Sequence, residues 1–320
     1  MGVALHELGH SLGLDHSEDS SAVMWPWFNK AKTALRQDGI SGIQSLYGVG
    51  SAPWKPMTSY AIKIAGSGGQ LFQLQADGCV YRKVDTAPFW ELTKEDSRTK
   101  NILSFAGNLF TLRTNGDIMR WSGVPLHMVL IDSNPTNVGI TGADTDLCLR
   151  HTTGAIWRHR WTPGDWEQID TRTNSVQIAA GGEHLYQLLS NSDILEYTKP
   201  GWKKIDFDDS SQGTAEIVAP DNQLYKRRHM GDIWVWVNKP NDWECIESNQ
   251  DIMSIVAGGE KYLFQVRNNG AILRWLSATG RFWRKLETAP NCMQVVIMED
   301  GTLYYLGRGG YIFRMAKKVM

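Results

Sequence analysis

The chain has 320 residues, of which 42% are hydrophobic and 21% are charged, a balance that provides a packed core and argues against disorder. The formal net charge of −1 gives no support to binding of nucleic acids or of anionic membranes. No apolar run approaches the roughly 20 residues of a membrane span. The four cysteines lie far apart and lack the C-x-x-C spacing of zinc ribbons or thioredoxin-like sites.

In chain order, the first informative element is a histidine motif at residues 6–16, which reads H-E-x-x-H-x-x-G-x-x-H. His6 and His10 are four residues apart, so on a helix their side chains project from one face. Gly13 allows the chain to leave that helix and to bring back a third imidazole, that of His16. Three imidazole nitrogens are a common ligand set for a catalytic zinc ion, with a fourth position left open.

Glu7 directly follows the first of these histidines. Beside a zinc ion, its carboxylate can take a proton from water and pass it to the leaving amine of a peptide bond. The motif fixes five positions, so a chance match in this chain has a frequency below about one in 10⁴. The sequence therefore predicts one catalytic Zn²⁺ and Glu7 as the general base. The predicted metal ligands are His6, His10 and His16.

Two further segments extend the pattern. Met24 lies in the segment Val-Met-Trp-Pro at residues 23–26, and residues 38–47 have the spacing of a helix. Together with the histidine motif, they resemble the end of the catalytic domain of a matrixin, a matrix metalloproteinase of the metzincin group. The resemblance covers residues 3–48. It implies hydrolysis of peptide bonds, secretion from the cell, and a Met24 turn beneath the metal that is not a ligand.

The resemblance does not extend to the front of a matrixin domain, because the chain begins one helical turn before the first predicted ligand. A matrixin carries its substrate-pairing sheet and its structural zinc and calcium sites in that front part. We therefore expect residues 1–48 to be a truncated C-terminal part of a matrixin-like zinc protease domain, with a short α-helical remnant. Ca²⁺ is expected only in the missing part.

The rest of the chain contains a repeat built on the pattern Gly-x-Ile-x-Arg, with anchors at residues 78, 116, 154, 192, 231, 270 and 310. Each unit is predicted to form four short strands, because period-two alternation recurs between Gly-Gly or Asn-Gly turns. A unit of this size cannot bury its own faces, whereas radial stacking of such units does. The repeat therefore predicts a β-propeller.

The blade count follows from the ends of the repeat. The seventh unit stops after its third strand, and residues 53–58 stand before the first unit without a blade of their own. We expect residues 53–58 to form the outer strand of the last blade, which closes the ring without an exposed edge. The predicted fold class is mainly β, with a seven-bladed β-propeller at residues 49–320 after the protease remnant at 1–48.

The repeat resembles that of tectonin-like or lectin-like propellers, which implies binding of glycan or protein. The favoured function is a zinc-dependent metalloendopeptidase of matrixin type whose propeller binds substrate, glycan or extracellular matrix. The alternative is a non-catalytic, lectin-like or protein-binding propeller with a vestigial protease remnant, because function resides in sites carried by a fold. The expected partner is a protein or peptide substrate, and neither nucleic acid nor a membrane span is expected.

Four arginines recur at one position of the repeat: Arg82, Arg120, Arg158 and Arg274. We interpret them as structural partners in ion pairs or hydrogen bonds rather than as ligand contacts.

Overall fold

The computed structural model describes residues 6–7, 9–10, 14–27, 54–58, 60–84, 90–143, 146–160, 165–182, 184–207, 212–220, 222–258, 262–276, 281–289 and 291–315. The chain divides into two compact units, residues 1–55 and 56–320. Among the described residues, no helix has the length and apolar character needed to cross a membrane.

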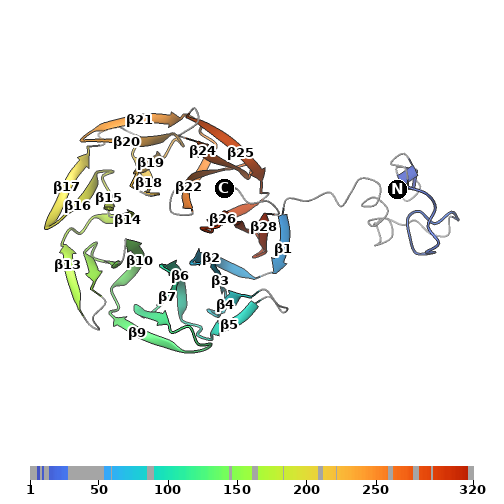
Figure 1. Ribbon diagram of the computed structural model, residues 1–320, viewed down its shortest axis with the longest axis horizontal. Helices are drawn as coiled ribbons and strands as arrows, with labels where there is room; N and C mark the ends of the chain where they lie inside the picture. Colours follow the sequence, from blue (N-terminus) through green and yellow to red (C-terminus); the bar gives the residue numbers. More distant parts are fainter. Residues whose placement is uncertain are drawn as a thin grey trace. The chain divides into compact units, whose positions relative to one another are not determined.

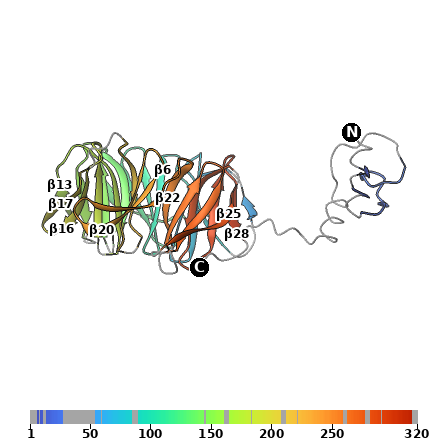
Figure 2. The ribbon, with the colours of Figure 1, turned by 90° about the horizontal axis from the view of Figure 1, so that it is seen from above.

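The second unit is a ring of seven four-stranded sheets, seen along its axis in Figure 1 and edge-on in Figure 2. Blade 1 contains β2 (Ala61–Ser67), β3 (Gln70–Gln75), β4 (Val80–Lys83) and β5 (Trp90–Lys94). Blade 2 contains β6 (Thr99–Phe105), β7 (Asn108–Arg113), β8 (Asp117–Trp121) and β9 (Met128–Ser133). Blade 3 contains β10 (Asn137–Ala143), β11 (Asp146–His151), β12 (Ile156–His159) and β13 (Trp166–Asp170).

The remaining blades repeat this order from the axis outward. Blade 4 contains β14 (Ser175–Gly181), β15 (His184–Leu189), β16 (Ile194–Thr198) and β17 (Gly201–Asp206). Blade 5 contains β18 (Thr214–Val218), β19 (Tyr225–Arg228), β20 (Ile233–Lys239) and β21 (Asp242–Glu247). Blade 6 contains β22 (Ile252–Gly258), β23 (Tyr262–Arg267), β24 (Ala271–Leu276) and β25 (Phe282–Thr288). Blade 7 contains β26 (Cys292–Ile297), β27 (Leu303–Gly307), β28 (Ile312–Met315) and β1 (Trp54–Thr58).

The seventh sheet combines strands from the two ends of the propeller sequence. Its order is β1-β28-β27-β26, so β1 is the outer strand and hydrogen-bonds to β28. Joining the two ends in one sheet closes the ring and leaves no open first or last blade. The prediction of a mainly β, seven-bladed propeller is confirmed.

In every blade except blade 4, the repeated glycine lies in the turn between the second and third strands. Gly116 has φ of +87°, a conformation that other residues rarely adopt. A Cβ atom there would also overlap the backbone of Asn134 and Pro135, in the loop that leads to the next blade. The glycine therefore allows the backbone of the hairpin turn to contact the backbone of the connecting loop. Ser192 takes the same positive-φ conformation in blade 4.

The hydrophobic core lies between neighbouring blades. Trp121 of blade 2 packs edge-on against Phe72 of blade 1, with ring centroids 5.9 Å apart. Tryptophans of the outer strands join such clusters as well: Trp90, Trp166, Trp243 and Trp283. These side chains are core residues, so they do not by themselves mark a ligand site.

Two glutamines link the innermost strands of adjacent blades. The Gln294 side chain in blade 7 accepts a hydrogen bond from Ile64 N at 2.9 Å and donates one to Ile64 O at 2.8 Å. Gln177 in blade 4 makes the same pair of bonds to Ile217 in blade 5, at 3.0 and 2.9 Å. Each glutamine thereby satisfies backbone groups on the inner edge of the neighbouring sheet.

Charged groups are buried where outer strands end. Lys94 lies 3.4 Å from Asp96 and donates to two threonine hydroxyls, while Arg113 Nε lies 2.5 Å from Asp96. Burial lowers the pKa of Lys94 to about 8, and Asp96 offsets this only in part. Burial alone would raise the pKa of Asp96, but the Arg98 N–H and the surrounding cations outweigh it and lower that pKa to about 2.

The recurring arginines take structural roles where a partner is available. Arg82 pairs with Glu91 at 2.5 Å, and Arg158 pairs with Glu167 at 2.6 Å, which confirms the structural interpretation for these two. The Arg274 guanidinium lies over the ring of Tyr262, 4.0 Å from its centroid.

Candidate metal centre

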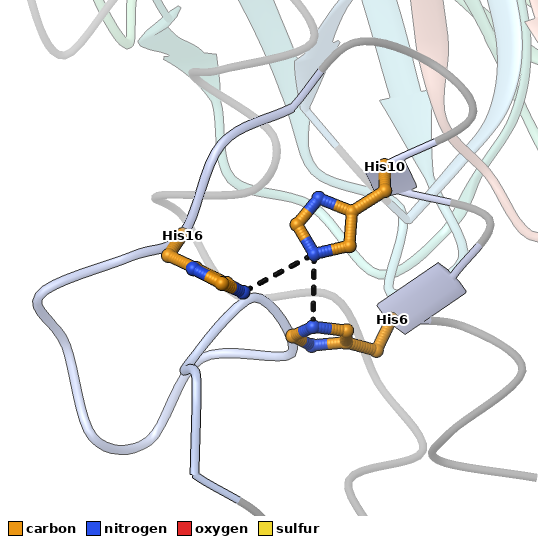
Figure 3. Close-up of side chains that lie close together, drawn as sticks. All are labelled: His6, His10 and His16. Carbon is orange, nitrogen blue, oxygen red and sulfur yellow. Dashed lines mark hydrogen bonds between the residues drawn. The ribbon is translucent and has the colours of Figure 1, made fainter.

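The first unit brings the three motif histidines together, and Figure 3 shows their rings pointing toward one another. Nε2 of His10 lies 3.1 Å from Nε2 of His6 and 3.2 Å from Nε2 of His16. The His10 ring is edge-on to both neighbours, with centroids 4.7 and 4.8 Å away. Two nitrogens bound to one tetrahedral zinc at ~2.0–2.1 Å are about 3.3–3.4 Å apart, so this spacing fits a shared metal ion.

Backbone carbonyls orient two of the rings. Val23 O lies 2.8 Å from Nδ1 of His6, and Leu14 O lies 2.9 Å from Nδ1 of His10. A carbonyl oxygen only accepts hydrogen bonds, so each Nδ1 carries the proton and donates it. Each Nε2 then presents a lone pair to the centre of the cluster, which is the tautomer of a metal-binding imidazole. Facing lone pairs at about 3 Å repel one another, and a cation between them removes this repulsion.

The methionine turn lies against the helical residues of the motif. Met24 is buried, and its carbonyl accepts a hydrogen bond from Ser17 N at 2.8 Å. A Cβ atom on Gly9 would overlap the Met24 sulfur, so glycine permits close packing of the turn against the backbone between the two histidines. Because Val23 precedes Met24, the same turn supplies the carbonyl that holds His6. Met24 thus lies where it supports the ring positions.

Among the predicted site residues, Glu7 has the least structural support for its role. It has helical backbone conformation and an exposed side chain, and it makes no hydrogen bond or ion pair with any residue that the structure describes. Its role as general base stays a prediction. His6, Gly9 and His10 are also helical, but residues 8 and 11–13 lie outside the described ranges, so the α-helical remnant as a whole is not confirmed. The helix predicted at residues 38–47 lies outside them too.

Asp19 is a supporting residue that the motif did not reveal. Its carboxylate accepts hydrogen bonds from Ser21 N at 2.8 Å and from Ser21 Oγ at 2.9 Å, and its carbonyl accepts one from Ala22 N at 2.9 Å. These bonds shape the turn that presents the Val23 carbonyl. The Asp-x-Ser spacing is a recognisable side-chain turn signal, but the carbonyls of Leu14 and Val23 carry no signal in the sequence.

Comparisons with known proteins agree with this division of the chain. The matrixin family model matches residues 1–48. Matrix metalloproteinase-2 of Drosophila melanogaster is 52% identical over 58 residues, which are 18% of this chain and 8% of that protein. Stromelysin-1 of Equus caballus is 56% identical over 50 residues, which are 14% of this chain and 10% of that protein. The match therefore spans about a tenth of the length of these relatives.

The propeller is similar to solved propellers in fold alone. A structure described as YCF48 bound to D1 peptide has a TM-score of 0.65 and 14% identity, and the match covers 84% of this chain and 98% of that one. The fold and the site together define a β-propeller protein with a metzincin-type histidine cluster. More particularly, the segment that carries this cluster is matrixin-like over residues 1–48, and it is fused to a seven-bladed propeller.

Proposed function

We propose that His6, His10 and His16 form the zinc centre of a matrixin-type metalloendopeptidase, with Glu7 as its general base. One observation carries this proposal: the three Nε2 atoms converge at 3.1 and 3.2 Å while two of the Nδ1 atoms are held by carbonyls. This donor set fits Zn²⁺, which prefers imidazole nitrogen in tetrahedral sites.

A bound zinc ion would supply Lewis acidity toward a peptide carbonyl and a more acidic water. The chain's own residues do the rest. Val23 and Leu14 hold the imidazoles of His6 and His10 in the ligating tautomer. The Glu7 carboxylate accepts a proton from the attacking water at a carboxylate oxygen and returns it to the nitrogen of the departing amine. Met24 keeps the turn packed beneath Gly9, so the rings do not spread apart.

The relatives support the peptidase class, since by name they include a matrix metalloproteinase, an interstitial collagenase and a stromelysin. Secretion and action on extracellular matrix are part of the same proposal, and they rest on the matrixin resemblance alone. The alignments cover only 8% to 10% of the two relatives described above, so hydrolysis by this chain is part of the proposal.

The propeller is proposed to bind a protein or peptide, with a glycan as the other candidate ligand. The fold presents open outer strand edges and exposed loops, and the similar YCF48 structure is described as holding a peptide. The matching propellers share too little sequence to transfer a site. A panel of purified matrix proteins and glycans, tested by surface plasmon resonance on the 320-residue chain, measures this binding role.

A second candidate function is a non-catalytic binding propeller. This function is favoured by the share of the chain that each part occupies, because the matrixin match covers 48 residues whereas the propeller fills most of the chain. In this case the histidine cluster has no catalytic task, and Glu7 has none either.

Zinc content and peptide hydrolysis, measured on the same preparation, separate the two. We expect one zinc per chain in both the wild type and Glu7→Gln, while only the wild type of these two cleaves a fluorogenic peptide. His10→Ala should lose both. Glu18→Gln, which alters an exposed carboxylate outside the motif, is the matched control. Bound zinc without cleavage in the wild type favours the binding propeller, and a wild type without zinc contradicts the proposed centre.

A further inference from the structure

The outer strand of blade 2 differs from the outer strands of the other blades. In five others whose side chains are described, the two residues after the first tryptophan of the strand include a charged side chain: Glu91-Leu92, Glu167-Gln168, Lys203-Lys204, Glu244-Cys245 and Arg284-Lys285. Blade 2 has Met128 in place of that tryptophan, followed by Val129 and Leu130, which are 38% and 54% exposed. A charged side chain on an edge strand normally discourages pairing with another chain. β9 lacks this protection at Val129 and Leu130, and its Asp132, near the end of the strand, accepts a hydrogen bond from Asn137 Nδ2 at 2.6 Å.

The loop before β9 extends the apolar surface. Val124 is 59% exposed and Leu126 is 60% exposed. Both are held in place by hydrogen bonds, since Trp121 Nε1 donates to Val124 O at 2.7 Å and Leu126 N donates to Thr93 O at 2.9 Å. These four side chains, Val124, Leu126, Val129 and Leu130, are called the blade-2 rim below. Val129 and Leu130 belong to β9, which lies at the outer edge of the ring in Figure 1, and Val124 and Leu126 precede it in the chain.

Arg120 lies next to the rim without the carboxylate that its counterparts have. In blade 1, Arg82 stands opposite Glu91 in the strand register and pairs with it at 2.5 Å. Blade 3 repeats this with Arg158. In blade 2 the residue opposite Arg120 is Val129, and Arg120 forms no ion pair within the part of the chain that the structure describes.

Arg120 interacts electrostatically with the imidazole of His159 in blade 3, a group that carries no negative charge. Burial lowers the pKa of His159 in blade 3, and the charge of Arg120 lowers it further, although nearby aspartates act in the opposite direction. The half-buried guanidinium therefore lies beside an imidazole and an apolar edge. A carboxylate brought to this edge would supply the missing counter-charge.

We propose that the blade-2 rim binds an extended segment of a partner protein as a fifth strand beside β9, with apolar side chains on the rim and an acidic side chain directed to Arg120. The inference rests on the proposed role of the propeller as a protein-binding module and names the surface and the kind of segment. Backbone hydrogen bonds to a free edge give affinity, and the side chains give selectivity. The new strand would lie two strand spacings, about 10 Å, from β8, a span that an arginine and a glutamate side chain cover together.

A second copy of this chain is a poorer occupant of the rim. Antiparallel pairing of β9 with another β9 places the two Arg120 side chains on the same face of the joined sheet. The second arginine lies about three strand spacings away, and Val129, which stands opposite Arg120 on each β9, carries no carboxylate, so the pairing supplies no counter-charge. The position of Arg120 therefore favours an acidic segment from another protein.

The test uses a fluorescein-labelled ten-residue peptide of alternating valine and threonine with one central glutamate. Binding to the 320-residue chain is measured by fluorescence anisotropy. Val129→Glu gives Arg120 an internal partner and should weaken binding at least tenfold. Replacing the peptide glutamate with glutamine should weaken it by a similar factor. The matched variant Glu91→Val turns the blade 1 pair into Val-Leu, as in blade 2, and should raise the number of sites per chain from one to two.

Hydrogen exchange in residues 128–131 should slow when the peptide is bound to the wild type, and circular dichroism confirms that each variant is folded. Equal affinities for wild type and Val129→Glu would overturn the proposal. The proposal would also be overturned if the peptide does not bind and light scattering shows a concentration-dependent dimer that Val129→Glu abolishes. If the panel of matrix proteins still binds Val129→Glu at wild-type strength, the rim is excluded while the binding role of the propeller stands.

Discussion

Gln294→Leu probes the contact by which the last blade meets the first. The glutamine supplies two hydrogen bonds to Ile64, whose side chain is fully buried, and leucine has a similar volume but no polar group. Ile64 N–H and C=O then lose their partner on the inner edge of blade 1. An unsatisfied buried polar group costs about 1–3 kcal/mol. Because water can replace part of the lost hydrogen bonding, we expect roughly 2 to 3 kcal/mol of destabilisation for the two groups together.

Urea unfolding followed by tryptophan fluorescence measures this loss as a shift in the midpoint at constant slope. In thermal unfolding, the same loss corresponds to a decrease in Tm of about 5–10 °C. Gln177→Leu removes the same pair of bonds between blades 4 and 5 and should cost a similar amount. Gln250→Leu, at an exposed turn, is the control and should be neutral. If Gln294→Leu unfolds like this control, the glutamine bridges do not hold the blades together.

Three further perturbations follow from the packing and the charges. Gly9→Ala forces a methyl group against the Met24 sulfur, so zinc affinity should fall at least tenfold in competition with a chelating dye; unchanged affinity would separate the turn from the site. Gly116→Ala, at φ of +87° and in contact with the next loop, should cost at least 2 kcal/mol in urea unfolding, and a neutral result would contradict the close approach. The third is pH-dependent. Burial opposes ionisation of Asp96, but the Arg98 N–H and neighbouring cations prevail and lower its pKa to about 2, below its value in the unfolded chain. Its stabilisation is therefore complete above about pH 4 and is lost as the pH falls toward 2, by about 1–2 kcal/mol. In Asp96→Asn, the loss of stability between about pH 4 and pH 2 should be smaller by this amount. An unchanged dependence of stability on pH would contradict the stabilising role of the Asp96 carboxylate.

The propeller could be predicted from the sequence because its signal is periodic. The recurrence of Gly-x-Ile-x-Arg marks the same hairpin in each blade, and the positive φ at Gly78 or Gly116 is a direct reason for glycine there. Each blade then needs a neighbour to bury its faces, so the count of units becomes the count of blades. The histidine cluster could also be predicted from the sequence, because helical spacing places His6 and His10 on one face.

What could not be predicted are contacts made by backbone groups and contacts between blades. The carbonyl of Val23 orients His6, but any residue supplies a carbonyl, so nothing in the sequence identifies it. The two bonds from Gln294 to Ile64 join residues 230 positions apart. The missing partner of Arg120 became visible only once the register placed Val129 opposite it. The sequence had offered one structural interpretation for all four recurring arginines, and the register separates Arg120 from Arg82 and Arg158.

The most direct test of the zinc centre is X-ray absorption at the zinc edge of the purified 320-residue chain with one equivalent of zinc. The convergence of the three imidazoles predicts three nitrogen ligands at ~2.0–2.1 Å, with the multiple-scattering pattern of imidazole. In His16→Ala this three-imidazole spectrum should be lost. A spectrum with sulfur ligands, or one with oxygen ligands alone that His16→Ala leaves unchanged, would contradict the site on which the peptidase assignment depends.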